Sequence, residues 1–383
     1  MKNKKTYFLF VLFLVLFFYG QRTSVAYAMD SEDFFSDFMG EEELEEIEQI
    51  VSENLDEEAF SFSGYVKKLV SGETKLSVSE VWNQIKTGVT QELNANRSLW
   101  VQCFVIALMV TFLTNLAEVF ENKQVGETGY FIGYLLLLSL LSSTFLQVFA
   151  VAENMLELLL TYVKALLPVY FMMTAVSSGS AVASGGYELA LLVIALVEFV
   201  VGKLVLPVVE IYFVLILLNH LSGEDRLGKL LELMETGIDW VLKGLLGVVT
   251  GMNVIQGLLL PAVQRVKQNV VWKTGEAIPV VGDALSGVAE TVFSVAVLLR
   301  NAIGVAGVVA MILICAMPLL KLFVYQVVFR VEAAFLQPMG DKRICQCLTG
   351  ISKTAGFLLY LELVSMLLFV LTILILSLTL TAV

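Results

Sequence analysis

The sequence predicts an all-α polytopic helical membrane protein, with about seven spans and some glycine-rich broken or interfacial helices, after a cleavable signal peptide. Of 383 residues, 58% are hydrophobic and 16% are charged, and the mean hydropathy is +0.83. A soluble globular domain has about 25% charged residues. The apolar residues also gather in runs long enough to cross the hydrocarbon core of a bilayer. Composition and patterning therefore agree on the membrane class.

Residues 1–28 are predicted to be a secretory signal peptide. Lysines at the start precede an apolar core at 7–19, and residues 26–28 form an A-x-A cleavage motif. An uncleaved membrane anchor is the alternative. Cleavage would place the mature N-terminus outside the cytoplasm.

Residues 29–97 are predicted to be an acidic, extracytoplasmic helical region. Residues 29–60 hold fourteen acidic side chains and no Lys or Arg. Nucleic acid is therefore not expected as a partner, because phosphate binding needs a basic surface. Apolar residues recur at helical spacing (Leu44, Ile47, Ile50, Val51, Leu55). The segment is either a solvated acidic helix or a docking helix for a basic partner.

Residues 98–383 are predicted to be the polytopic membrane domain. Its apolar segments are 98–120, 130–152, 155–176, 187–220, 244–263, 303–328 and 354–380. Segment 187–220 is too long for one untilted span, and Gly202 and Pro207 indicate a break near its middle. Residues 222–243 have the pattern of an amphipathic interfacial helix. Lys and Arg collect in cytoplasmic loops, which favours the cytoplasmic side for 330–353 and 222–243.

Residues 275–304 form a glycine-rich stretch between apolar segments. A helix here would place Gly282 and Ser286 on one face and Gly304 near it. Small residues at four-residue spacing let two helices approach closely in lipid, so these three are candidate helix-packing positions. A broken or interfacial helix is the alternative.

The sequence does not predict an enzyme, a cofactor or a metal site. His220 is the only histidine, and neither H-E-x-x-H nor a phosphate-binding loop occurs. Asp283 follows Val281 and Gly282 without the first glycine of an intramembrane aspartyl protease motif. Cys345 and Cys347 do not complete a four-ligand zinc site.

Charged residues inside apolar segments are the better candidates for function, because such groups are costly in a bilayer and often face a water path. The candidates for a polar path are Glu198, Lys203, Glu210, Asp283 and Arg300. The alternative is that they extend to the interface or pair to hold helices together. That alternative is favoured for Glu157, Lys321 and Glu362, which lie nearer segment ends.

Three stretches are similar to the stage III sporulation protein AE family of endospore-forming bacteria. They are QGLLLPAVQRVK (256–267), AIPVVGDALSGVAETV (277–292) and LLRNAIGVAGV (298–308). The second is the most specific, and the resemblance covers nearly all of the chain after the signal.

The resemblance implies a multi-pass protein made in the mother cell and placed in the membrane around the forespore. It also implies a channel or secretion-like complex that joins the two cells, with a secretion-type ATPase and ring-forming proteins as partners. A homo-oligomer is compatible with it, and no catalytic residues follow from it. A secondary transporter for a small solute and a membrane scaffold without a passage are the alternatives.

Overall fold

The computed structural model describes residues 41–55, 60–71, 78–119, 123–221, 226–275, 282–338 and 342–381. The predicted signal peptide and residues 29–40 lie outside the described residues. Every regular element in the described part is helical, in agreement with the all-α prediction.

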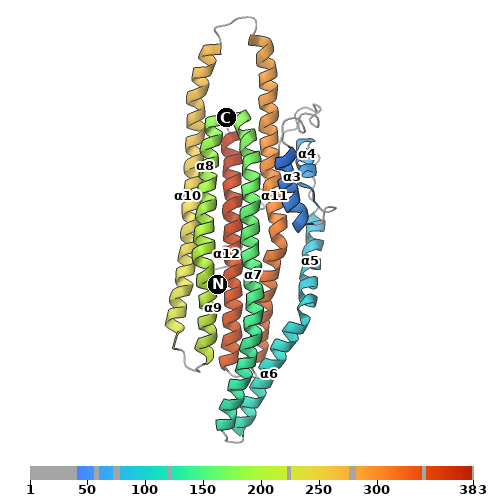
Figure 1. The fold of residues 1–383 in the computed structure, drawn as a ribbon, viewed down its shortest axis with the longest axis vertical. Coiled ribbons are helices and arrows are strands. Elements are labelled where there is room, and N and C mark those ends of the chain that lie inside the picture. Colours follow the sequence, from blue (N-terminus) through green and yellow to red (C-terminus); the bar gives the residue numbers. More distant parts are fainter. Residues whose placement is uncertain are drawn as a thin grey trace.

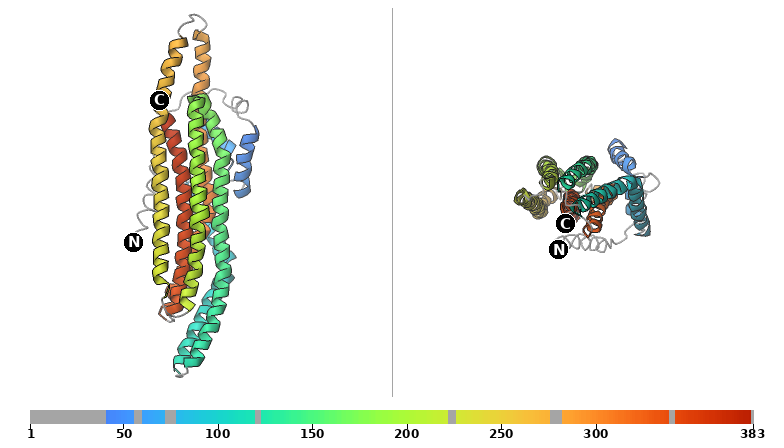
Figure 2. Two further views of the ribbon diagram at one scale, coloured as in Figure 1. Left: turned by 60° about the vertical axis from the view of Figure 1, so that its left-hand side comes forward. Right: turned by 90° about the horizontal axis from the view of Figure 1, so that it is seen from below.

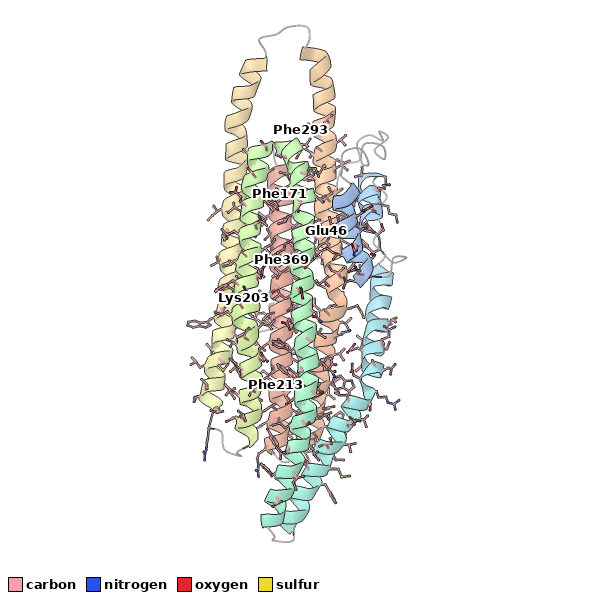
Figure 3. The ribbon with its side chains drawn as sticks, viewed as in Figure 1. Glu46, Phe171, Lys203, Phe213, Phe293 and Phe369 are labelled. Atoms are coloured by element: carbon pink, nitrogen blue, oxygen red, sulfur yellow. The ribbon has the colours of Figure 1, made fainter. Side chains whose placement is uncertain are left out.

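Long antiparallel helices form the body of the molecule (Figure 1). They are α7 (Lys123–Ser178), α8 (Ser180–Val197), η1 (Glu198–Val205), α9 (Leu206–Leu221), α10 (Gly228–Gly275), α11 (Gly282–Leu336) and α12 (Lys342–Thr381). The last helix, α12, contacts α11, α10, α9 and α7, and it is the most buried of the candidate spans. It therefore forms the centre of the bundle, where Phe369 is buried (Figure 3).

The described helices include five that are long and apolar enough to cross a membrane. A sixth crossing results if the bent pair Lys86–Ala95 and Arg97–Phe112 counts as one span. The prediction of seven spans is not confirmed, because the predicted segments 130–152 and 155–176 are two halves of α7. The 56 residues of α7 extend for about 84 Å at about 1.5 Å per residue. A hydrocarbon core is only about 30 Å thick, so this helix reaches well beyond it.

Glycine does not break α10. Residues 244–263 lie inside a continuous helix that also contains most of the predicted interfacial segment 222–243. This glycine-rich segment is therefore not one of the broken helices that the sequence predicts. In the stretch 275–304, residues 276–281 lie outside the described residues, and α11 begins at Gly282.

Four described helices precede the bundle: α3 (Glu41–Asn54), α4 (Phe62–Ser71), α5 (Val78–Ala95) and α6 (Arg97–Val119). Ile47 and Val51 of α3, with Phe62 and Val66 of α4, are fully buried in the same apolar core as the long helices. The contacts are between α3 and α7 and between α4 and α11. The acidic segment thus docks on its own chain and leaves acidic side chains such as Glu46 outside (Figure 3).

Glu48 connects α3 to α4. The backbone N–H groups of Phe62 and Ser63 donate to its carboxylate at 3.1 and 2.9 Å. These N–H groups belong to the first turn of α4 and have no partner within that helix. The carboxylate therefore satisfies them and also lies at the positive end of the helix dipole.

Gly133 allows α6 and α7 to pack closely. A Cβ atom at Gly133 would lie 2.2 Å from Cγ2 of Val110, whereas a Cβ at Gly129, one turn earlier, would meet nothing within 4 Å. We expect Gly133→Val to lower the free energy of unfolding by about 1–3 kcal/mol, because the introduced branched side chain and that of Val110 cannot both fit. Gly129→Val is the matched control. Thermal melting of the purified full chain in detergent measures the difference. Equal melting temperatures for the two variants would contradict this packing.

Candidate functional site

The structure places the predicted polar-path residues in two different environments. Lys203 and Glu210 are exposed on the outside of the bundle, and Glu198 is partly exposed beside them. Arg300 is fully buried in the core. Asp283 lies in the first turn of α11, and its side chain is outside the described residues. The described members of the predicted set therefore do not line one interior path.

The exposed residues belong to a surface that α7 shares with η1 and α9, which run side by side (Figure 2). Lys164 of α7 and Glu198 of η1 form an ion pair of 3.4 Å, and both side chains are about half exposed. Further along, Phe145 of α7 stacks on Phe213 of α9 at 3.6 Å between ring centroids. We call the charged residues of this surface the outer polar face: Glu153, Glu157, Lys164, Glu198, Lys203 and Glu210.

The spacing of these residues gives each helix one charged stripe. On α7 the charges at 153, 157 and 164 recur every four or seven residues, which places them on one side of an α-helix. On the partner helix, Lys203 follows Glu198 by five residues inside η1, and Glu210 follows seven residues later. The stripes meet at the Lys164–Glu198 pair.

The π-helical segment η1 lies where the sequence predicts a break. Its last hydrogen bond runs from the N–H of Leu206 to the carbonyl of Val201, five residues earlier. Pro207 is the next residue. Proline has no N–H, so the carbonyl of Lys203 cannot accept the usual helical hydrogen bond from it, and the proline ring also clashes with that carbonyl. The chain accommodates this by widening the turn and continues in the same direction. Such π-helical turns occur frequently at functional sites.

Arg300 lies where α11 passes the end of α7. Its Nη1 donates to the hydroxyls of Ser177 and Ser178, at 3.1 and 2.9 Å. Its Nε and Nη2 have no hydrogen-bond partner, and no carboxylate among the described residues pairs with it. The C-terminus of α7 carries the negative end of the helix dipole, which stabilises the positive charge of Arg300.

Gly179 makes the turn that presents these serines. Its φ of +92° lies in the left-handed region, which glycine adopts without a Cβ clash. The helix α7 ends just before it, and α8 begins just after it. Arg300 thus fixes the tip of the α7–α8 hairpin from inside the bundle.

The three predicted helix-packing positions all lie in α11. At Gly304, a Cβ would lie 3.3 Å from the Tyr170 ring and 3.5 Å from the Ser377 hydroxyl, so α11 approaches both α7 and α12 closely there. Gly282 and Ser286 lie in the first turns of α11, and their side-chain surroundings are outside the described residues.

Two buried carboxyl groups were not among the predicted site residues. Glu362 of α12 is fully buried, and neither of its oxygen atoms has a hydrogen-bond partner. Glu332 of α11 is 6% exposed and lies beside Cys103 of α6. In the sequence, Glu362 can be recognised as the single acidic residue of a long segment that is apolar on every side of the helix.

The described residues contain no group of three or more His, Cys, Asp or Glu side chains that could hold a metal ion. Cys347 is buried, with its Sγ 3.9 Å from the Tyr134 hydroxyl, and Cys345 is partly buried. The hydroxyl of Tyr134 also donates to the carbonyl of Leu217 at 2.5 Å. This cluster joins α7, α9 and α12.

Comparison with known proteins gives one family. The family described as stage III sporulation protein AE matches residues 60–379. The stage III sporulation protein AE of Bacillus subtilis (strain 168) is 23% identical over 299 residues, which are 78% of this chain and 75% of that protein. No solved structure matches the chain.

Proposed function

Since the chain belongs to the stage III sporulation protein AE family, we propose that it is a non-enzymatic membrane subunit of a sporulation-specific channel or secretion-like complex between mother cell and forespore. Its outer polar face lines or supports the passage. The partners are other proteins of the same complex, including a secretion-type ATPase that supplies the energy and ring-forming proteins. The observation that carries this proposal is the outer polar face itself.

A face of this kind is poorly suited to lipid. Lys203 and Glu157 lie near the middle of two candidate spans, and both are exposed. A charged group at the centre of a bilayer costs about 2.5–3.5 kcal/mol on insertion scales. Several such groups on one face would cost as much as the whole folding free energy of a typical protein, about 5–15 kcal/mol. Water or protein therefore covers this face in the membrane.

The proposal also includes an orientation. Basic residues gather where α10 and α12 begin and α11 ends, which is the lower end of the bundle in Figure 1. They are Arg226, Lys229, Arg330, Arg343 and Lys353. Because Lys and Arg are more frequent in cytoplasmic loops, this end faces the mother-cell cytoplasm. The helices α3 and α4, at the upper half of the bundle, are then extracytoplasmic.

The first test is to neutralise the outer polar face. We expect the triple variant Glu157→Gln, Lys203→Met, Glu210→Gln to lose most heat-resistant spores when it replaces the native copy in the host. Its stability should change by less than about 1 kcal/mol, because exposed charges contribute little to folding. Lys229→Met, an exposed lysine at the start of α10, is the control. Normal spore counts in the triple variant would exclude a role for this face.

The second test separates a passage from a scaffold. Single cysteines are placed at Lys203, Glu157 and Val248 in a chain that lacks its four native cysteines, and intact sporulating cells receive a water-soluble maleimide. Val248 is an exposed apolar residue of α10, a helix that contributes nothing to the outer polar face, and it serves as the control. Labelling at 203 and 157 but not at 248 supports an aqueous passage. Protection at all three positions favours a scaffold whose charged face is covered by protein.

A further inference from the structure

Glu362 is an acidic residue enclosed by the bundle on all sides. It lies near the middle of α12, it has no exposed surface, and both carboxyl oxygens lack a hydrogen-bond partner. It is separate from the outer polar face, whose members are exposed or partly exposed. Nothing in the proposed passage uses this residue.

Among the described residues, no Lys or Arg forms an ion pair with Glu362. From α11, its titratable neighbour is the buried thiol of Cys315. From α7, the buried Tyr162 lies close to Cys315, and its hydroxyl donates instead to the carbonyl of Gly307 at 2.9 Å. On α10, Lys243 is more than half exposed and pairs with Asp239. On α9, Glu210 points outward as part of the outer polar face.

Such surroundings do not accommodate a negative charge. An ion that is removed from water without a partner costs several kcal/mol even after the protein relaxes. A metal cation would need several oxygen ligands, and no group of three or more acidic or thiol side chains surrounds this site in the described part of the chain. The proton is the one cation that a single carboxyl group can bind alone.

We propose that Glu362 is a proton-binding site in the core of the bundle, and that the protein releases this proton to water only when α11 and α12 separate. In that step the carboxylic acid gives its proton to a water molecule and becomes a carboxylate. The carboxylate needs solvent, so ionisation and opening of the bundle occur together. The packing itself requires no titratable group here, because the carboxyl makes no hydrogen bond. This inference does not rest on the proposed passage.

Infrared spectroscopy of the purified full chain in detergent tests the proton directly. We expect the wild-type protein at neutral pH to show the carbonyl stretch of a protonated carboxylic acid, and Glu362→Gln to lose that band. The exposed acid Glu188 provides the control, since Glu188→Gln should leave the band unchanged. A wild-type spectrum that Glu362→Gln does not alter would overturn the proposal.

Thermal melting as a function of pH gives a second measurement. The folded chain retains a proton that an unfolded glutamate releases above a pH of about 4.3. Stability therefore falls as the pH rises wherever the folded state holds more protons than the unfolded state. We expect the melting temperature of the wild type to fall more steeply between acidic and neutral pH than that of Glu362→Gln. Parallel curves would contradict a proton held by the folded state.

Spore formation tests whether release of the proton is used. Glutamine has the size of the neutral acid but cannot ionise, so Glu362→Gln should fold, accumulate to the wild-type level and yield few heat-resistant spores. Wild-type spore numbers from this variant would show that release has no role. Because the infrared and melting experiments use the isolated protein, their outcomes are independent of the outer polar face.

Discussion

Replacement of Trp100 with alanine is expected to lower the free energy of unfolding by about 3–5 kcal/mol. The indole of Trp100 is 8% exposed and makes edge-on contacts with the rings of Tyr325 and Phe329, at 4.8 and 5.5 Å between centroids. It comes from the first turn of α6, just after the bend of 56° that separates α5 from α6. Alanine would leave a cavity and remove two aromatic pairs, each worth about 0.5–1.5 kcal/mol beyond its buried area.

The neighbouring residue provides the control for Trp100. Val101 is 54% exposed on the same helical turn, so Val101→Ala should change stability by less than about 0.5 kcal/mol. Thermal melting of both variants in detergent measures the difference, and limited proteolysis between α5 and α6 reports whether this pair has detached from α11. Equal melting temperatures would show that the aromatic cluster does not hold α6 in place.

Replacement of Arg300 with methionine is expected to stabilise the bundle while reducing spore formation. An apolar side chain of similar volume removes a buried ionic group that has no carboxylate partner. Replacement of buried ion pairs by apolar side chains has stabilised proteins by about 1–4 kcal/mol, and a lone buried cation costs at least as much. The C-terminal dipole of α7 favours the cation by about 0.3–1 kcal/mol and reduces that gain. We therefore expect a net increase of about 1–2 kcal/mol in the free energy of unfolding. Because Arg300 lowers the stability of the bundle, we expect that the function of the protein requires it.

Arg330 provides the matched control for Arg300. It is an exposed arginine of the same helix, so Arg330→Met should leave both stability and spore formation close to the wild type. If Arg300→Met melts lower than the wild type, the hydrogen bonds to Ser177 and Ser178 stabilise more than the buried charge costs. If its spore count is normal, Arg300 has a structural role only.

The sequence predicts which segments are apolar and helical, but not where each helix ends. Segments 130–152 and 155–176 look separate because Glu153 and Asn154 interrupt the apolar run. A charge changes hydropathy without ending a helix, and no glycine or proline occurs there to end it. Conversely, Gly244, Gly247 and Gly251 lie in the continuous α10, because isolated glycines only weaken a helix.

The candidate site was predictable in residue type but not in location. Lys203, Glu210 and Glu362 each interrupt an apolar run, yet the first two are exposed and the third is fully buried. Apolar residues surround all three on every side of their helices, so no periodicity distinguishes the inner face from the outer face. Packing against neighbouring helices determines which side of a helix is buried, and those helices come from distant parts of the sequence. The predicted break near Gly202 and Pro207 is not found, because the helix continues through this point. A local irregularity there was easier to anticipate, since proline acts on its own helix.

The docking of α3 and α4 on the bundle determines when these helices can finish folding. The apolar residues of α4 are buried against α11, which is synthesised roughly two hundred residues later. At about 5–20 residues per second, the ribosome needs roughly 10–40 s to make that stretch. Phe62 and Val66 are therefore without their native partner for that time. The N-terminal helices are made first and packed late, so their apolar residues stay accessible to a chaperone or a protease until α11 has been made.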